Sequence, residues 1–256
     1  MKTHTTKSTY FSKNRRGCVT ILLCVFVNFF SIAQDKRSLD SLINNYNKLS
    51  VDSDRFDNLV QQIKVYRLGE PEKAMALSQQ LIPLSKKIGT QNYQAKAFLN
   101  LAIQYRKQGN YDSSITLYTQ ALNIFEKLKD EAQIATCCGS MGIGFWQQKN
   151  YEPAIRYFRK SLEITHKLGK RANECSNLNN IGGVFFDMQQ YDSSLTYLHA
   201  SLAISEEMRD TAGLADAYGN MGAVYVLLND TANAMKYSVL GEIGRASCRE
   251  RVLVAV

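Results

Sequence analysis

Residues 180–194 read Asn-Ile-Gly-Gly-Val-Phe-Phe-Asp-Met-Gln-Gln-Tyr-Asp-Ser-Ser, and the framework of this stretch recurs every forty residues along the chain. Residues 140–154 repeat it as Ser-Met-Gly-Ile-Gly-Phe-Trp-Gln-Gln-Lys-Asn-Tyr-Glu-Pro-Ala, so Tyr151 and Tyr191, like Tyr111 before them, stand at one place in successive copies. Self-similarity at a period of about 20 to 50 residues is typical of a solenoid, in which one small unit is stacked on the next. The repeat therefore predicts the fold and limits the function.

Each forty-residue unit is predicted to contain two amphipathic helices joined by a tight turn. In the second unit, helix A is expected over residues 92–108 and helix B over residues 112–129, with Gly109-Asn110 between them. Helix B has apolar residues near every 3.6 positions, which predicts one buried stripe, and Asp112 is its candidate N-cap. The stripe consists of Ile115, Tyr118, Leu122 and Phe125. The same frame divides residues 54–240 into units at 54–90, 91–130, 131–170, 171–210 and 211–240, the first degenerate and the last partial.

These units resemble tetratricopeptide repeats of a lengthened, forty-residue kind. Seven offsets of that family's pattern are matched in the second unit by Leu101, Ala102, Tyr105, Tyr111, Ser114, Tyr118 and Ala121. The third unit supplies Met141, Gly142, Phe145, Tyr151, Ala154, Phe158 and Ser161, and the fourth supplies Ile181, Gly182, Phe185, Tyr191, Ser194, Leu198 and Ser201. The resemblance implies an all-α fold, a right-handed superhelical solenoid of antiparallel helix pairs. The departures are Ala102 in place of glycine and the absence of a proline at the end of helix B.

The first 33 residues have the features of a signal peptide. Basic residues precede an apolar run at residues 18–30, and Ser31-Ile32-Ala33 places small residues before a cleavage site at Gln34. An uncleaved anchor is the competing interpretation, but a membrane span needs roughly 20 apolar residues. The mature chain is therefore expected to begin at Gln34, with residues 34–53 forming a helix and linker, and to be exported, in a Gram-negative bacterium to the periplasm.

The net charge of +8 would suggest nucleic-acid binding if the basic residues were clustered, but they are spread unevenly along the chain. Five basic residues precede the first apolar run, which leaves 26 basic against 23 acidic residues. Phosphate binding needs a clustered basic stripe, which this distribution does not predict. We therefore expect a protein or peptide partner and no nucleic acid, with membrane contact only through the signal segment or a missing C-terminal span.

Catalytic, cofactor and metal sites have little support in the sequence. Cys137 and Cys138 are adjacent, no Cys-x-x-Cys or Cys/His ligand spacing occurs, and buried apolar cysteines are the simpler interpretation. His166 and His199 stand at unmatched repeat positions without a recognisable nucleophile or ligand. We predict no enzymatic activity, no cofactor and no metal.

Residues 241–256 depart from the repeat in the middle of a helix. The frame requires apolar residues at positions 242 and 244, as at Leu202 and Ile204, but the chain has Glu242 and Gly244. The segment also resembles a translated adapter or vector read-through. We therefore expect a non-native tail on a truncated gene product, and a last unit that frays.

By the resemblance, partners are held by helix A side chains that line the concave face of the stack. The expected groove positions are Asn100, Ile103, Arg106, Ser140, Ile143, Trp146, Asn180, Gly183, Phe186, Asn220, Ala223 and Val226. The asparagines can pair with a peptide backbone and the aromatic residues can anchor an apolar side chain. Two alternatives stay open: the asparagines bridge adjacent helices A, or the aromatic residues are covered core. A basic clamp for a peptide's terminal carboxylate is not predicted, because the candidate residues Lys96, Arg106 and Lys107 all fall in one unit.

Three functions fit this organisation. The first is an exported scaffold that binds a peptide or partner protein in the concave groove. The alternative is the periplasmic sensor region of a bacterial histidine kinase or transcriptional regulator, whose membrane span and effector domain followed residue 240. The third is an enzyme that has lost its catalytic domain. The continuation of the gene past codon 240 separates them, since a span of about 20 apolar residues would favour the sensor.

Overall fold

The computed structural model describes residues 39–46 and 48–254, and this part of the chain contains helices and turns but no strand. Residues 39–46 form a short helix that precedes the array. The A helices are α2 (Asp52–Gly69), α4 (Gln91–Lys107), α6 (Glu131–Gln147), α8 (Arg171–Asp187) and α10 (Thr211–Leu227). The B helices are α3 (Pro71–Ile88), α5 (Tyr111–Leu128), α7 (Tyr151–Lys167), α9 (Tyr191–Met208) and α11 (Thr231–Val254). The predicted all-α, right-handed superhelical solenoid of antiparallel helix pairs is confirmed.

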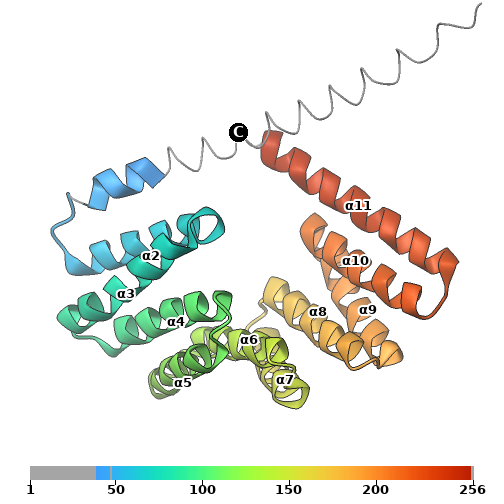
Figure 1. Cartoon of the computed structure of the whole chain (residues 1–256), viewed down its shortest axis with the longest axis horizontal. Coiled ribbons are helices and arrows are strands. Elements are labelled where there is room, and N and C mark those ends of the chain that lie inside the picture. The colour runs from blue at the N-terminus through green and yellow to red at the C-terminus, as the bar shows by residue number, and fades with distance from the viewer. Residues whose placement is uncertain (1–38, 47, 255–256) are drawn as a thin grey trace, which may run out of the picture.

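The helix pairs stack into an arc that is open on one side (Figure 1). Contacts between elements join consecutive helices and, more sparsely, adjacent A helices such as α4 with α6 and α6 with α8. Helices α4, α6 and α8 lie on the inner side of the arc, and α5, α7 and α9 lie on its outer side. The inner face is therefore built by A helices, as the resemblance implied.

Within a unit, helix A approaches helix B so closely that a methyl group would not fit between them. A Cβ atom built on Gly142 would lie 2.7 Å from Phe158 Cδ1, and one on Gly182 would lie 2.9 Å from Leu198 Cγ. The small residue one turn before Leu198 adds a hydrogen bond, because Ser194 Oγ donates to the Gly182 carbonyl at 2.8 Å. Ser114 Oγ makes the same 2.8 Å bond to the Ala102 carbonyl. The expected close packing is thus present.

The hydrophobic core runs along the stack as a row of fully buried side chains. Tyr118, Phe158 and Leu198 occupy the same place in three successive units and are each 0% exposed. Beside them, Phe145 stacks on Tyr157 and Phe185 on Tyr197, each with ring centroids 5.4 Å apart. Since each unit packs on both neighbours through such residues, the core is shared between units and belongs to none of them alone.

The turns place a residue in the left-handed region every twenty residues. These residues are Gly89, Gly109, Lys129, Lys149, Gly169, Gln189, Arg209 and Asn229, with φ between 54° and 79°. In the A–B turns of the second to fifth units, the end of helix A is closed by a backbone N–H that donates to the carbonyl five residues before it, as Asn150 N does to the Phe145 carbonyl at 2.9 Å. This geometry moves the start of helix B to Tyr111, so Asn110 and not Asp112 caps it, accepting from Ser113 N at 3.2 Å.

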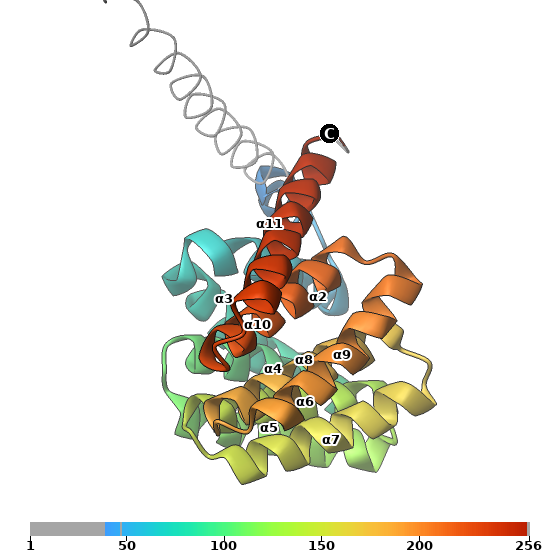
Figure 2. The same ribbon diagram turned by 90° about the vertical axis from the view of Figure 1, so that its right-hand side faces the viewer.

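The last helix, α11, continues without a break from Thr231 through the position where the repeat pattern ends. Figure 2 looks at this end of the stack, where α11 lies over α10 and projects beyond it. Small residues permit the contact: a Cβ atom on Gly241 would lie 3.2 Å from Gly219 N, and one on Gly244 would lie 2.9 Å from Ala215 Cβ. The helix thus continues through residues 241–254, beyond the end of the repeat pattern, while fraying of the last unit stays a prediction. No helix among the described residues is long and apolar enough to cross a membrane.

Replacing Gly182 with leucine is expected to destabilise the array by about 1 to 3 kcal/mol or more, because the new side chain overlaps Leu198. Chemical denaturation followed by circular dichroism measures the change. Gly139→Ala is the matched control, since its Cβ would meet Ser161 Oγ at 3.4 Å, an ordinary contact. Equal stability of Gly182→Leu and wild type would show that the register of helices A and B is wrong.

Replacing Arg209 with glycine is expected to raise the stability by about 1 kcal/mol, because its φ of 54° lies in the region that costs a residue with a Cβ atom roughly 1 to 2 kcal/mol. The control is Arg209→Ala, which removes the same exposed side chain but keeps the Cβ atom. The two variants are compared by thermal unfolding, and a midpoint for glycine no higher than that for alanine would contradict the assignment.

Candidate interaction groove

Within the part of the chain that the structure describes, three cavities lie along the inner face of the A helices. The first, of about 400 Å³, is bounded by α2, α4 and α6. The second, of about 520 Å³, and the third, of about 120 Å³, lie on the two sides of Trp146, which lines both. The inner face therefore forms a groove of separate pockets, which we call the N-terminal, middle and C-terminal pockets.

The N-terminal pocket combines an aliphatic floor with a basic rim. Ile63 and Ile103 form part of the floor, and Asn100 lies beside them. The charged lining residues are Asp57, Lys64, Arg67 and Lys96. Because Lys64 and Arg67 come from α2 and Lys96 from α4, the cations face the same cavity from two units.

Trp146 is held in a fixed place at the centre of the groove. Its Nε1 donates a 2.7 Å hydrogen bond to Asp187 Oδ2 on the next A helix. Its six-membered ring lies against Gly183, where a Cβ atom would come within 2.5 Å of Trp146 Cη2. The indole also meets Phe158 edge to face, with centroids 6.5 Å apart. Gly183 thus gives the indole room to lie across the junction between α6 and α8.

The C-terminal pocket is small and mostly apolar. Trp146, Phe186 and Leu198 line it, with Asn220 and Ala223 from α10. Asp187 lines this pocket and the middle one, so its carboxylate is a polar group that both share. A pocket of this size suits one apolar side chain beside a hydrogen-bond acceptor.

Hydrogen bonds between neighbouring A helices cross the groove floor at a spacing of 40 or 41 residues. Besides the Trp146–Asp187 bond, Arg106 Nη1 donates to Gln147 Oε1 at 3.4 Å, and Lys107 Nζ donates to the Arg67 carbonyl at 3.2 Å. Asn220 Nδ2 donates to Asn179 Oδ1 at 3.0 Å, which supports the bridging interpretation for this asparagine. Asn100 instead donates to the Lys96 carbonyl of its own helix at 2.9 Å.

The structure brings some of the predicted groove residues together and leaves others apart. The residues that line the three pockets are Asn100, Ile103, Ile143, Trp146, Gly183, Phe186, Asn220 and Ala223. The predicted residues that line none of these pockets are Arg106, Ser140, Asn180 and Val226. Val226 lies near the end of α10 and is 58% exposed. Trp146 and Phe186 are half-buried and face cavities, so they are not fully covered core.

Sequence reasoning missed three charged residues of the groove, namely Asp187, Lys64 and Arg67. Asp187 stands 41 residues after Trp146, one residue beyond the repeat period, so matching identical repeat positions could not pair the two. Lys64 and Arg67 line the N-terminal pocket but fall in the degenerate first unit, for which no groove positions were predicted. Applying the forty-residue frame to that unit would have placed Arg67 at the position of Lys107.

The cysteines and His166 make contacts that suit a structural role. Burial raises the pKa of the Cys137 thiol to about 12 and that of Cys138 to about 11, so both stay protonated and unreactive near neutral pH. Cys175 contacts Ser201 Oγ and Ser205 Oγ at 3.1 and 3.0 Å. His166 lies near the exposed end of α7, and its Nδ1 is 3.0 Å from Oε1 of Glu174 on α8. No group of three or more metal-binding side chains occurs within the described residues.

Comparison with known families gives the chain's relatives. The tetratricopeptide repeat profile matches residues 93–166 and 173–238, which together are more than half of the chain. The chain belongs to the tetratricopeptide repeat family. Members of this family are helical repeat scaffolds for protein–protein interaction, and the fold is typically non-catalytic. A comparison with curated proteins finds no significant match.

Solved structures share the tetratricopeptide repeat fold at low sequence identity. BtubC (BKLC) from P. vanneervenii is 21% identical, with a TM-score of 0.68 over 85% of this chain and 90% of that one. A Rap protein complexed with competence and sporulation factor is 15% identical, with a TM-score of 0.72 over 82% and 59% of the two chains. Aspartyl phosphate phosphatase F from Bacillus subtilis is 18% identical, with a TM-score of 0.66 over 75% and 52%. The chain thus spans little more than half of the last two proteins.

Replacing Gly183 with alanine is expected to move the Trp146 indole off α8 and to shift its fluorescence to longer wavelength, because the added methyl overlaps the ring. Trp146 is the single tryptophan, so the whole emission spectrum reports on the groove. Gly139→Ala, an equal change in the same region but away from the indole, should leave the spectrum unchanged. An unshifted spectrum for Gly183→Ala would mean that the indole does not lie against α8.

Proposed function

We propose that this chain is an exported scaffold that holds an extended peptide segment of a partner protein along the concave face of its repeats. The observation that carries the proposal is the row of three pockets on the inner face, which are lined by side chains from every A helix; Trp146 divides the middle pocket from the C-terminal one. Pockets placed along one groove suit a chain that offers side chains at intervals. A single compact ligand would fill one pocket only.

The aromatic anchors support peptide binding at the centre of the groove. Interface energy is concentrated in a few large side chains that face well-packed pockets. Trp146 and Phe186 meet this description, since both are half-buried and both line the C-terminal pocket. Export rests on residues 1–33, which lie outside the described residues, and is tested by locating the protein in fractionated cells.

The experiment is to select ligands for purified wild-type protein from a displayed peptide library and to measure their affinities by fluorescence anisotropy. Replacing Trp146 and Phe186 together with alanine should weaken the selected peptides roughly ten- to a hundredfold, which corresponds to the loss of about 1 to 3 kcal/mol of anchor contacts. Circular dichroism verifies that the variant is folded.

The matched control replaces Met235 and Val239 with alanine. These residues are 70% and 48% exposed on α11, outside the groove, so the control removes comparable apolar surface elsewhere. Equal affinities for the groove variant and wild type would refute the proposal. Weaker binding by the α11 control alone would place the site at the end of the stack.

A further inference from the structure

The basic side chains at the N-terminal end of the groove form one cluster. Lys64, Arg67 and Lys96 line the N-terminal pocket. Lys107 adjoins them because its Nζ donates to the Arg67 carbonyl, and Arg106 precedes it on α4. Burial, with Arg67 and Arg106 nearby, lowers the pKa of Lys107, as expected where positive charges gather. We call these five residues the basic cluster.

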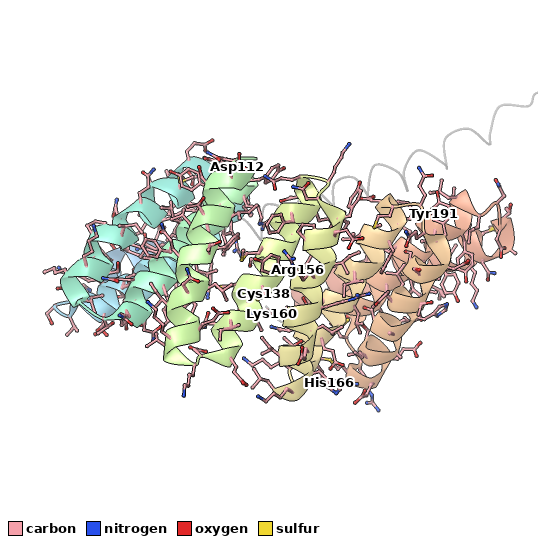
Figure 3. All side chains as sticks on the ribbon, turned by 90° about the horizontal axis from the view of Figure 1, so that it is seen from below. Asp112, Cys138, Arg156, Lys160, His166 and Tyr191 are labelled. Carbon is pink, nitrogen blue, oxygen red and sulfur yellow. The ribbon has the colours of Figure 1, made fainter. Side chains whose placement is uncertain are left out.

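Within the described part of the chain, none of the five forms a salt bridge, although ion pairs are common elsewhere on the molecule. Lys87 pairs with Asp52 at 2.8 Å, Lys160 with Glu126 at 2.8 Å, and Lys167 with Glu131 at 2.7 Å. Figure 3 shows the outer side of the stack, where Lys160 and His166 lie along α7. Carboxylates therefore neutralise lysines on other faces, while the basic cluster has Asp57 as the one carboxylate lining its pocket.

The other end of the groove lacks this excess of positive charge. Asp187 lines the middle and C-terminal pockets, and Lys149 is the only cation among the residues that line these two pockets. An occupant that runs along the groove thus meets positive charge over α2 and α4, and apolar surface with a carboxylate over α6, α8 and α10. This asymmetry distinguishes acidic from basic segments.

We infer that the N-terminal half of the groove recognises the acidic side chains of a partner protein's peptide segment, which the basic cluster binds through Asp or Glu residues. The inference rests on the proposed function and specifies which kind of peptide the groove prefers. The aliphatic floor of the N-terminal pocket, including Ile63 and Ile103, favours a peptide over a nucleic acid. Single-stranded nucleic acids need exposed aromatic platforms for their bases, whereas Phe56, the aromatic residue that lines this pocket, is 0% exposed.

The test uses three labelled peptides with one apolar residue each and amidated C-termini, so that no terminal carboxylate contributes. The first has adjacent Asp and Glu residues, the second has Asn and Gln at those places, and the third has Lys. Charge-assisted hydrogen bonds are expected to make the acidic peptide bind at least about tenfold tighter than its amide counterpart, with the preference reduced at high salt.

The protein variants separate the cluster from net charge. Lys64→Glu combined with Lys96→Glu should abolish the preference for the acidic peptide. The matched control is Lys127→Glu with Lys170→Glu, which changes the net charge equally at exposed positions on α5 and in the α7–α8 turn. This control should keep the preference within about twofold, since exposed charges at that distance are screened.

Each other outcome counts against the inference in a different way. Equal affinity for all three peptides overturns the inference and leaves the proposed function standing. A preference that survives Lys64→Glu/Lys96→Glu overturns the placement of the site. Tighter binding of a single-stranded oligonucleotide than of the acidic peptide overturns the choice of partner. Binding of no peptide, including those selected from the library, overturns the proposed function as well.

Discussion

The contact between helix A and helix B of one unit allows no side chain at Gly142 or Gly182. This contact sets the distance between the two helices, and the distance decides how far the aromatic and aliphatic residues of helix B reach toward the next unit. Since Phe158 and Leu198 are fully buried there, the same contact fixes the pitch at which units stack. The inner surface follows from that pitch: with wider spacing, Trp146 could not lie on Gly183 and bond Asp187.

The fold was largely predictable because its determinants recur at a fixed spacing. Helix boundaries at Gln91–Lys107 and Tyr111–Leu128 lie within a residue or so of those expected, since the turn residues and apolar stripes repeat every forty residues. The N-cap was misplaced by two residues because the left-handed residue and the Schellman-type bond at the end of helix A require Asn110 at the cap. Periodicity gives the elements, while their exact ends depend on turn geometry.

The candidate groove was only partly predictable. Equivalent repeat positions gave Trp146 and Phe186, and the structure places both around one cavity. The contacts that define the pockets, however, are offset by one residue from the period, as between Trp146 and Asp187. Curvature adds a second effect, because it brings α2, α4 and α6 around a single pocket and so unites charges from separate units. Neither the offset nor the curvature is visible in one unit read by itself.

The two ends of the groove are built by almost separate sets of helices. The N-terminal pocket uses α2, α4 and α6, and the C-terminal pocket uses α6, α8 and α10. In a stack where each unit contacts only its neighbours, the structural effect of a substitution in α2 can be transmitted to α10 only through the units between them. Recombination of whole units between such proteins can therefore exchange one half of the recognition surface while the other half is inherited intact.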